Sequence, residues 1–385
     1  MNCLHNWEYV RIGDVCTVER GGSPRPIEQF ITDDPNGINW IKIGDTNDSM
    51  YITSTAQKIV PEGMKKSRYV QPGDFLLSNS MSFGRPYILK IDGCIHDGWL
   101  VLRDDNGLFD KKFLYYYLSA PSTYQKFKNM AVGGVVNNLN SDMVRKVTVP
   151  VPTMEEQVTI VSVLDRVTRL IAMRKEQLAK LDELVKARFV ELFIGKGYPT
   201  KTVDEVSLGK GEYGAQSASV GYDPTRPRYV RITDINDDGT LNDDVVASIN
   251  PADDKQYKLE YGDFMFARMG ATVGKTYAFI EGNQIFAGYL IRYRLNQKLI
   301  NPRYLFWYTK LDEYWNWVKL NQSGAAQPGI NAKKFGSLQI PLPSIEEQNA
   351  FAAFVEQTNK TKLTIQSSLD KLEVMKKALM QEYFG

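Results

Sequence analysis

The nine residues from Val149 to Gln157 read VPVPTMEEQ, and the nine from Ile340 to Gln348 read IPLPSIEEQ. Five of these nine positions are identical, and the two copies are 191 residues apart. The same shift pairs FLYYY at 113–117 with YLFWY at 304–308, and GGVVNNLN at 133–140 with GAAQPGIN at 324–331. Collinear matches of this kind indicate an internal duplication that covers nearly the whole chain.

Each half has two parts of different character. Residues 1–148 and 196–339 are rich in Gly, Pro, Asn, Asp and aromatics. Their short apolar runs predict strands between turns, with a helix near 111–128 and its copy near 302–320. Residues 153–193 and 344–384 contain no Pro or Gly, which predicts one long helix in each half.

The start of each long helix is marked by a capping box, Thr153 with Glu156 and Ser344 with Glu347. Apolar residues then recur at steps of four and three, a heptad seam. A helix of ~40 residues is roughly 60 Å long, too long to lie within one globular part, so we expect antiparallel pairing that returns the C-terminus to the first module. The alternative is two ordinary bundle helices, each folded onto its own module. The seam residues are Ile160, Leu164, Val167, Ile171, Leu178, Leu181, Val185 and Leu192, then Phe351, Val355, Ile365, Leu369, Leu372, Leu379 and Tyr383.

Composition indicates a globular protein with a net charge of only +2, so any charge that serves a nucleic acid must be local. The three cysteines, Cys3, Cys16 and Cys94, are an odd number, which favours a reducing cytosol and a packing role. The chain begins without a signal peptide and has no run of ~20 apolar residues, and we therefore expect a cytoplasmic protein. Two histidines and no metal-spaced cysteine pair predict no metal site.

Two divergent modules, each followed by a helix that begins Pro-x-Pro-[Ser/Thr]-x-Glu-Glu-Gln, resemble the specificity subunit of Type I restriction–modification systems over the entire chain. The resemblance implies an α+β fold that is internally duplicated. Two globular α/β target recognition domains would be separated by a long antiparallel two-helix coiled coil. The expected segments are 1–148 for the first recognition domain, 149–195 for the first spacer helix, 196–339 for the second recognition domain and 340–385 for the second spacer helix.

The resemblance also implies a function without catalysis. Each recognition domain would read one half of an asymmetric bipartite site in double-stranded DNA. The helices would set the spacing and dock two modification subunits, and restriction subunits can join such complexes. No cofactor is expected on this chain, because S-adenosylmethionine would belong to the modification subunit, and no membrane partner is expected.

The scaffolds of the two halves match while their loops differ, for example at 78–86 against 267–275. Arg, Asn and Ser side chains in loops can contact base edges, and Lys can contact phosphates. The DNA-contact candidates are Arg20, Arg25, Ser78, Asn79, Ser82 and Arg85 in module one, and Arg226, Arg228, Arg268 and Lys275 in module two. Asn137, Asn138, Gln327 and Asn331 lie in paired loops and serve either bases or their own turns. On the long helices, Arg166, Arg169, Lys175 and Lys180 are candidates for contact with a modification subunit.

Three strings imitate enzyme motifs, at 209–214, 270–276 and 301–304, but each lacks a residue or context that its motif requires. Asp74 and Asp263 both follow Gly, and a turn before a strand is the preferred interpretation over a paired metal site. Two rival functions remain open from the sequence: an autonomous nuclease or DNA methyltransferase, and a coiled-coil adaptor without DNA specificity.

Overall fold

A computed structural model of the chain describes residues 7–79, 84–131, 138–249, 256–324 and 328–385. The chain forms two compact units, one of residues 1–174 with 368–385 and the other of residues 175–367. Both long helices therefore contribute to both units, and each unit is described here by itself.

Unit 1 contains two five-stranded sheets and one two-stranded sheet. The central sheet has the order β2-β11-β8-β9-β5, and the outer one has the order β3-β6-β4-β10-β7. Strands β8 and β9 are buried along their whole length, so the central sheet forms the core of the module. The elements are β1 (Glu8–Arg11), α1 (Ile12–Val15), β2 (Thr17–Arg20), β3 (Ile31–Thr32), β4 (Ile38–Ile41), β5 (Tyr51–Ile52), β6 (Gln57–Ile59), β7 (Arg68–Val70), β8 (Phe75–Ser78), β9 (Pro86–Leu89), β10 (Gly93–Ile95), β11 (Trp99–Arg103), α2 (Lys111–Ser119), α3 (Pro121–Ala131), α4 (Ser141–Arg145) and β12 (Thr148–Val151).

Unit 2 repeats this arrangement with fewer strands. Its central sheet has the order β14-β21-β18-β19, which corresponds to β2-β11-β8-β9, and the parallel pair β16-β20 corresponds to β4-β10. The duplication in the sequence is thus a duplication of topology. The elements are β13 (Thr200–Thr202), β14 (Glu212–Tyr213), β15 (Ser219–Gly221), β16 (Arg228–Val230), β17 (Ala247–Ile249), β18 (Asp263–Ala267), β19 (Thr276–Ala278), β20 (Gln284–Phe286), β21 (Leu290–Arg294), α6 (Pro302–Tyr308), α7 (Asp312–Asn321), α8 (Ala332–Gly336) and β22 (Gln339–Pro341).

The prediction of a single helix near 111–128, with its copy near 302–320, is wrong, because each region forms a pair of helices. Helix α2 ends at Ser119 and α3 begins at Pro121, and a proline at the first helical position lacks the N–H that would continue the preceding helix. In unit 2, α6 ends at Tyr308 and α7 begins at Asp312. No proline marks that second break in the sequence.

The two long helices are confirmed as α5 (Met154–Phe193) and α9 (Ile345–Phe384). Both predicted capping boxes are present. The Thr153 N–H donates to Glu156 Oε2 at 2.8 Å, and the Ser344 N–H donates to Glu347 Oε2 at 2.9 Å. Among the described residues, no helix is both long and apolar enough to cross a membrane.

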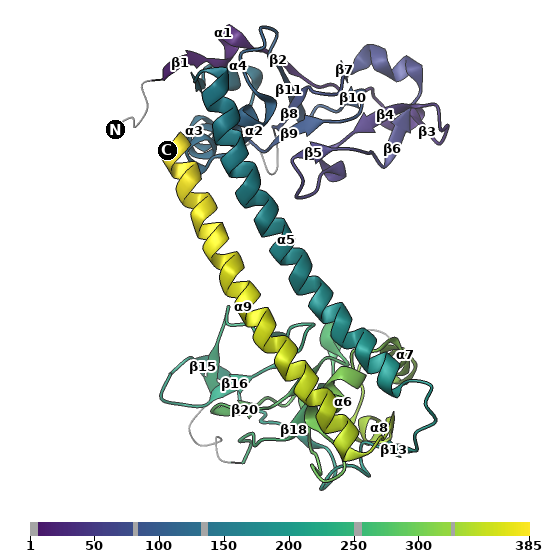
Figure 1. Cartoon of the computed structure of the whole chain (residues 1–385). Coiled ribbons are helices and arrows are strands. Elements are labelled where there is room, and N and C mark those ends of the chain that lie inside the picture. The colour runs from purple at the N-terminus through teal and green to yellow at the C-terminus, as the bar shows by residue number, and fades with distance from the viewer. Residues whose placement is uncertain (1–6, 80–83, 132–137, 250–255, 325–327) are drawn as a thin grey trace. The chain divides into compact units, whose positions relative to one another are not determined.

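The ends of the two long helices meet inside the modules, in antiparallel directions. In unit 1 the last turn of α9 packs on α2, with the Phe384 ring 5.6 Å from that of Phe113, and the Ser122 hydroxyl of α3 donates to the Phe384 carbonyl at 2.6 Å. Figure 1 shows the C-terminus beside α3. In unit 2 the last turns of α5 pack on the first turns of α9, with the rings of Phe189 and Phe351 5.3 Å apart. The predicted return of the C-terminus to the first module is confirmed.

The glutamine that ends both motifs holds the start of each long helix against its module. Gln157 is fully buried, donates to the Leu108 and Pro152 carbonyls at 2.9 and 3.0 Å, and accepts from the Asp110 N–H at 2.8 Å. Gln348 is fully buried too and makes the same three contacts, to Leu299, Pro343 and Asn301. The amide joins the beginning of the long helix to the beginning of α2 or α6.

Replacing Gln348 by leucine should therefore lower the free energy of unfolding of unit 2 by about 2–3 kcal/mol, since three buried backbone groups lose their partner. Urea unfolding of the full chain measures the loss. Gln357→Leu, at an exposed position of the same helix, is the matched control and should change stability by less than about 0.5 kcal/mol. Equal stability of the two variants would contradict a holding role for Gln348.

Candidate nucleic-acid interface

In both modules, loops far apart in the sequence meet at one end of the central sheet. In unit 1 the Asn79 N–H donates to the Gly98 carbonyl and the Leu139 N–H donates to the Asn79 carbonyl, both at 2.9 Å. In unit 2 the Arg268 N–H donates to the Tyr289 carbonyl at 3.0 Å, and the Ile330 N–H donates to the Arg268 carbonyl at 2.9 Å. Asn79 and Arg268 thus occupy equivalent backbone positions, and only the side chain differs.

In module one, Asp97 organises the loop cluster. Its carbonyl accepts from Arg20 Nε at 3.1 Å and from Asn79 Nδ2 at 2.8 Å. Its carboxylate accepts from Ser23 Oγ at 2.9 Å and pairs with Arg25 Nη2 at 3.2 Å. The structure therefore brings together three of the predicted contact residues, Arg20, Arg25 and Asn79.

The charge of Asp97 is stabilised by these neighbours. Burial acts to raise the pKa of its carboxyl, but the Ser23 hydroxyl, His96 and Arg25 together hold the pKa below the usual range. A carboxylate that stays ionised remains available to pair with Arg25. The side chain of Arg25 is nevertheless 80% exposed, so most of its surface faces solvent.

The remaining module-one candidates differ in exposure. Ser78 and Asn79 are buried, 1% and 4% exposed, and the Ser78 hydroxyl accepts from the Arg85 N–H at 3.0 Å. The Arg85 side chain is exposed and lines a hollow of about 470 Å³ with Tyr87, Tyr115 and Tyr124. Asn138 is exposed. Ser82 and Asn137 lie outside the described residues.

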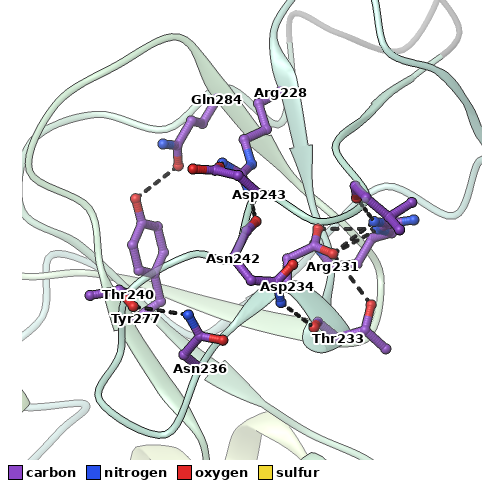
Figure 2. A network of polar contacts seen from close by, with 11 residues as sticks. Arg228, Arg231, Thr233, Asp234, Asn236, Thr240, Asn242, Asp243, Tyr277 and Gln284 are labelled. Carbon is purple, nitrogen blue, oxygen red and sulfur yellow. Dashed lines mark hydrogen bonds and ion pairs between the residues drawn. The ribbon is translucent and has the colours of Figure 1, made fainter. Parts of the chain in front are cut away.

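In module two, Arg228 and Arg231 belong to a polar network around the loop after β16. Arg228 Nη1 pairs with Asp243 at 2.7 Å, and Arg231 Nη2 pairs with the buried Asp234 at 2.7 Å and donates to the Val245 carbonyl at 2.6 Å. Figure 2 shows Arg228 beside Asp243 and Arg231 against Asp234. The predicted candidate Arg228 is therefore held by the loop, while the sequence analysis did not single out Arg231.

The other module-two candidates are placed separately. Lys275 pairs with Asp237 at 2.8 Å. Arg226 is partly buried, and its Nη2 has no hydrogen-bond partner among the described residues. Asn331 accepts from the Lys334 N–H at 2.9 Å and so caps α8, as Asn140 caps α4. Asn331 thus has the turn-forming role that was one of its two predicted roles. Gln327 lies outside the described residues.

The carboxylates that could suggest a nuclease act in turns and ion pairs. Asp74 accepts from the Gln71 N–H and Asp263 from the Glu260 N–H, both at 3.0 Å, which confirms the predicted turns. Each also pairs with an arginine, Arg103 or Arg292. Within the described ranges, no group of three or more His, Cys, Asp or Glu side chains is arranged to hold a metal ion.

The predicted packing role of the cysteines is confirmed for Cys16 and Cys94, which are free and buried. Burial, with Asp104 and Asp105 nearby, raises the pKa of the Cys16 thiol to about 12, so this thiol is inert at neutral pH. Cys3 lies outside the described residues.

The helix residues predicted to meet a partner are all exposed. Arg166 and Arg169 line an open hollow of about 670 Å³ together with Tyr51 of module one. Lys180 pairs with Glu176 at 2.6 Å one turn earlier on α5, and Lys175 is solvent-exposed.

Besides Arg231, three residues that organise these surfaces were not predicted from the sequence. Asp97 is one, and the others are Tyr213 and Tyr289, whose rings contact the guanidinium of Arg268 with centroids 4.8 and 6.0 Å from Cζ. A signal was available, because Asp97 and Tyr289 stand one or two residues before the equivalent strands β11 and β21, where the two halves match in sequence.

The chain has two modules of one topology, and their polar and basic loops differ at the same end of the sheet. Two long helices are shared by both units. These features define a class of internally duplicated recognition proteins. The sequence profile described as the Type I restriction modification DNA specificity domain matches residues 5–183 and 213–374, and the chain belongs to this family. Curated relatives that match this chain are specificity subunits, so the chain is a DNA-recognition subunit of a Type I restriction–modification complex and is not itself an enzyme.

Relatives and solved structures agree with this assignment. The MjaVIII specificity subunit of Methanocaldococcus jannaschii is 22% identical, over 97% of this chain and 91% of the relative. The EcoBI specificity subunit of Escherichia coli is also 22% identical, over 91% of this chain and 79% of the relative. The crystal structure of the S subunit from M. genitalium superposes with a TM-score of 0.57 at 14% identity, over 100% of this chain and 98% of that one. A chain from a structural study of type I complex assembly gives 0.63 at 18%, covering 98% and 97%, and both show the same fold.

Proposed function

We propose that each module reads one half of an asymmetric bipartite site in double-stranded DNA. The observation that carries this proposal is the pair Asn79 and Arg268. Their backbones make equivalent hydrogen bonds in the two modules, yet one side chain is a buried amide and the other an arginine. Base edges are distinguished by the side chains that face them, so equal scaffolds with unequal side chains favour two unequal half-sites.

Within this proposal, the basic residues of the loops supply the contacts. Arg20, Arg25 and Arg85 would face the DNA in module one, and Arg226, Arg228, Arg268 and Lys275 in module two. A net charge of +2 makes this distribution necessary, because attraction to phosphates has to come from local clusters. DNA of the cell is the proposed substrate, and the cytoplasm is the expected location.

The long helices would fix the distance between half-sites and dock two modification subunits, one for each copy of the repeat. Both helices carry exposed apolar side chains, which are typical of surfaces that meet a partner. Arg166, Arg169, Lys175 and Lys180 would add charged contacts at the rim. S-adenosylmethionine would be held by the modification subunit, and this chain would contribute no group to the methyl transfer. The exposed apolar residues are Met154, Val158, Leu170, Met173, Leu184 and Val190 on α5, and Leu363, Val374 and Met375 on α9.

Methylation mapping at single-base resolution tests the proposal. Genomic DNA from cells that express this chain with its modification subunit should carry a new methylated motif with two unequal halves and a fixed gap. Cells with the modification subunit alone are the control. Unchanged methylation beside a demonstrably active modification subunit would contradict the proposal and favour an adaptor without DNA specificity. Methylation or cleavage by the purified chain alone would favour an autonomous enzyme.

A further inference from the structure

The guanidinium of Arg268 lies over two tyrosine rings, Tyr213 and Tyr289, at the end of the central sheet of unit 2. Arg268 directly follows β18, Tyr289 directly precedes β21, and Tyr213 belongs to β14. These three strands are neighbours in the sheet. The Arg268 Cζ atom is 4.8 Å from the Tyr213 centroid and 6.0 Å from the Tyr289 centroid, distances typical of cation–π contacts.

Hydrogen bonds hold this arrangement on all sides. The backbone of Arg268 is bonded through its N–H to Tyr289 and through its carbonyl to Ile330. The hydroxyl of Tyr213 accepts from the Ala332 N–H at 3.2 Å, at the start of α8. The backbone of Arg268 and the ring of Tyr213 are thus held in place before any ligand arrives, which lowers the entropy cost of binding.

The arginine fork has no oxygen acceptor within the described part of the chain. Nε is buried and unbonded, and Nη2 contacts only the sulfur of Met269 at 3.4 Å, a weak acceptor. Nearby arginines differ, because Arg228, Arg231 and Arg292 each pair with a carboxylate. An oriented guanidinium without an oxygen acceptor, beside tyrosines that are 40% and 54% exposed, points to an acceptor supplied by a ligand.

We propose that Arg268 reads a guanine in the half-site of module two, by donating two parallel hydrogen bonds to O6 and N7 in the major groove. The inference rests on the proposed function and names one base of its substrate. A planar donor fork that rests on aromatic rings fits the two in-plane acceptors of guanine. An arginine fork can also donate two bonds to one phosphate, and base preference therefore distinguishes the two contacts.

Module one cannot make the same contact at the equivalent position. Asn79 is 4% exposed, and its amide nitrogen donates to the Asp97 carbonyl at 2.8 Å. Any guanine in the other half-site would be read by a different residue. The effect of changing Arg268 should therefore be confined to one half of the site.

The test uses the full chain assembled with its modification subunit, and a duplex library in which both half-sites are randomised. The variants are Arg268→Ala and Arg268→Lys. The matched control is Arg294→Ala, an arginine on β21 that is 46% exposed. Thermal melting of each complex shows whether the variants are folded. Sequencing of the bound DNA gives base preferences at every position.

The parent should select guanine at one position of one half-site. Both Arg268 variants should lose this preference for guanine by roughly tenfold or more, and their preferences in the other half-site should be unchanged. Arg294→Ala should keep the parental preferences. Three results would overturn the inference. The first is a parental module-two half-site without guanine, and the second is an unchanged preference for guanine in Arg268→Lys. The third is a uniform loss of affinity with unchanged base preferences, which indicates a phosphate contact. If the parent selects no bipartite sequence, the proposed function itself fails, and this outcome is distinct from the other three.

Discussion

Replacing Arg292 by methionine is expected to lower the free energy of unfolding of unit 2 by about 3–5 kcal/mol, the usual effect of breaking a buried ion pair. Arg292 and Asp263 are each 3% exposed, with Nη1 and Oδ2 3.3 Å apart. Arg292 also pairs with Glu212 and donates to the Lys258 carbonyl at 2.9 Å. Methionine fills a similar volume but leaves the Asp263 carboxylate buried without a counter-charge.

The loss of unfolding free energy in Arg292→Met should depend on pH. Burial raises the pKa of Asp263, against the lowering effect of the Glu260 N–H and Arg292. Without Arg292 the folded-state pKa rises further above that of the unfolded chain. Between the unfolded and folded pKa values of Asp263, the folded variant binds more protons than the unfolded chain. The stability that Arg292→Met loses relative to the parent therefore becomes smaller as the pH falls through this range. Urea unfolding at pH 7 and pH 5 measures both effects.

Arg294→Met is the matched control, because Arg294 is 46% exposed and 3.9 Å from Glu212, and such a pair contributes at most about 1 kcal/mol. Arg103 makes analogous contacts in module one, to Glu19 and Asp74, with 15–29% exposure of the three side chains. Its replacement should therefore cost less than that of Arg292. Equal losses for Arg292→Met and Arg294→Met would mean that the buried pair is not a major source of stability.

Truncating Phe384 to alanine is expected to destabilise unit 1, which contains the N-terminal module, by about 3–5 kcal/mol. Phe384 is 5% exposed, and its ring lies 5.6 Å from Phe113 and 5.8 Å from Tyr117. A residue next to the C-terminus thus completes a core that is built almost entirely from residues before position 165. Calorimetry of the full chain measures the unfolding transitions of the variant.

Val374→Ala on the same helix is the control, since Val374 is 69% exposed, and its effect should stay within about 0.5 kcal/mol. Phe193→Ala is the counterpart in unit 2. Phe193 is 2% exposed and its ring is 5.0 Å from that of Tyr304. A Phe384→Ala chain that melts like the parent would show that the last turn of α9 does not stabilise the module.

Much of the fold was predictable because its signals are local. The long helices follow from two stretches without Pro or Gly, and their starts from Thr153 and Ser344 with a glutamate three residues later. The duplication predicted that the two modules share one topology, and the repeated sheet order confirms it. The break between α6 and α7 was not predicted, because no proline marks it.

The candidate interface was predictable only in part. The sequence indicated which loops differ, and the hydrogen bonds of Asn79 and Arg268 place those loops at equivalent positions. It did not indicate that Asn79 is buried, that Asp97 gathers Arg20 and Arg25, or that two tyrosines contact Arg268. These contacts join residues that are 18 to 77 positions apart, and spacing along the chain carries no information about them.

By itself the sequence determined the repeat, the starts of the two long helices and the family, because periodicity, capping residues and a doubled motif depend on neighbouring positions. Only the tertiary structure decided which polar side chains remain open to a ligand. Whether an arginine is paired, as Arg292 is, or has no oxygen acceptor among the described residues, as Arg268 does, depends on which strands lie side by side. Burial and acceptors from distant segments, rather than residue type, set that difference.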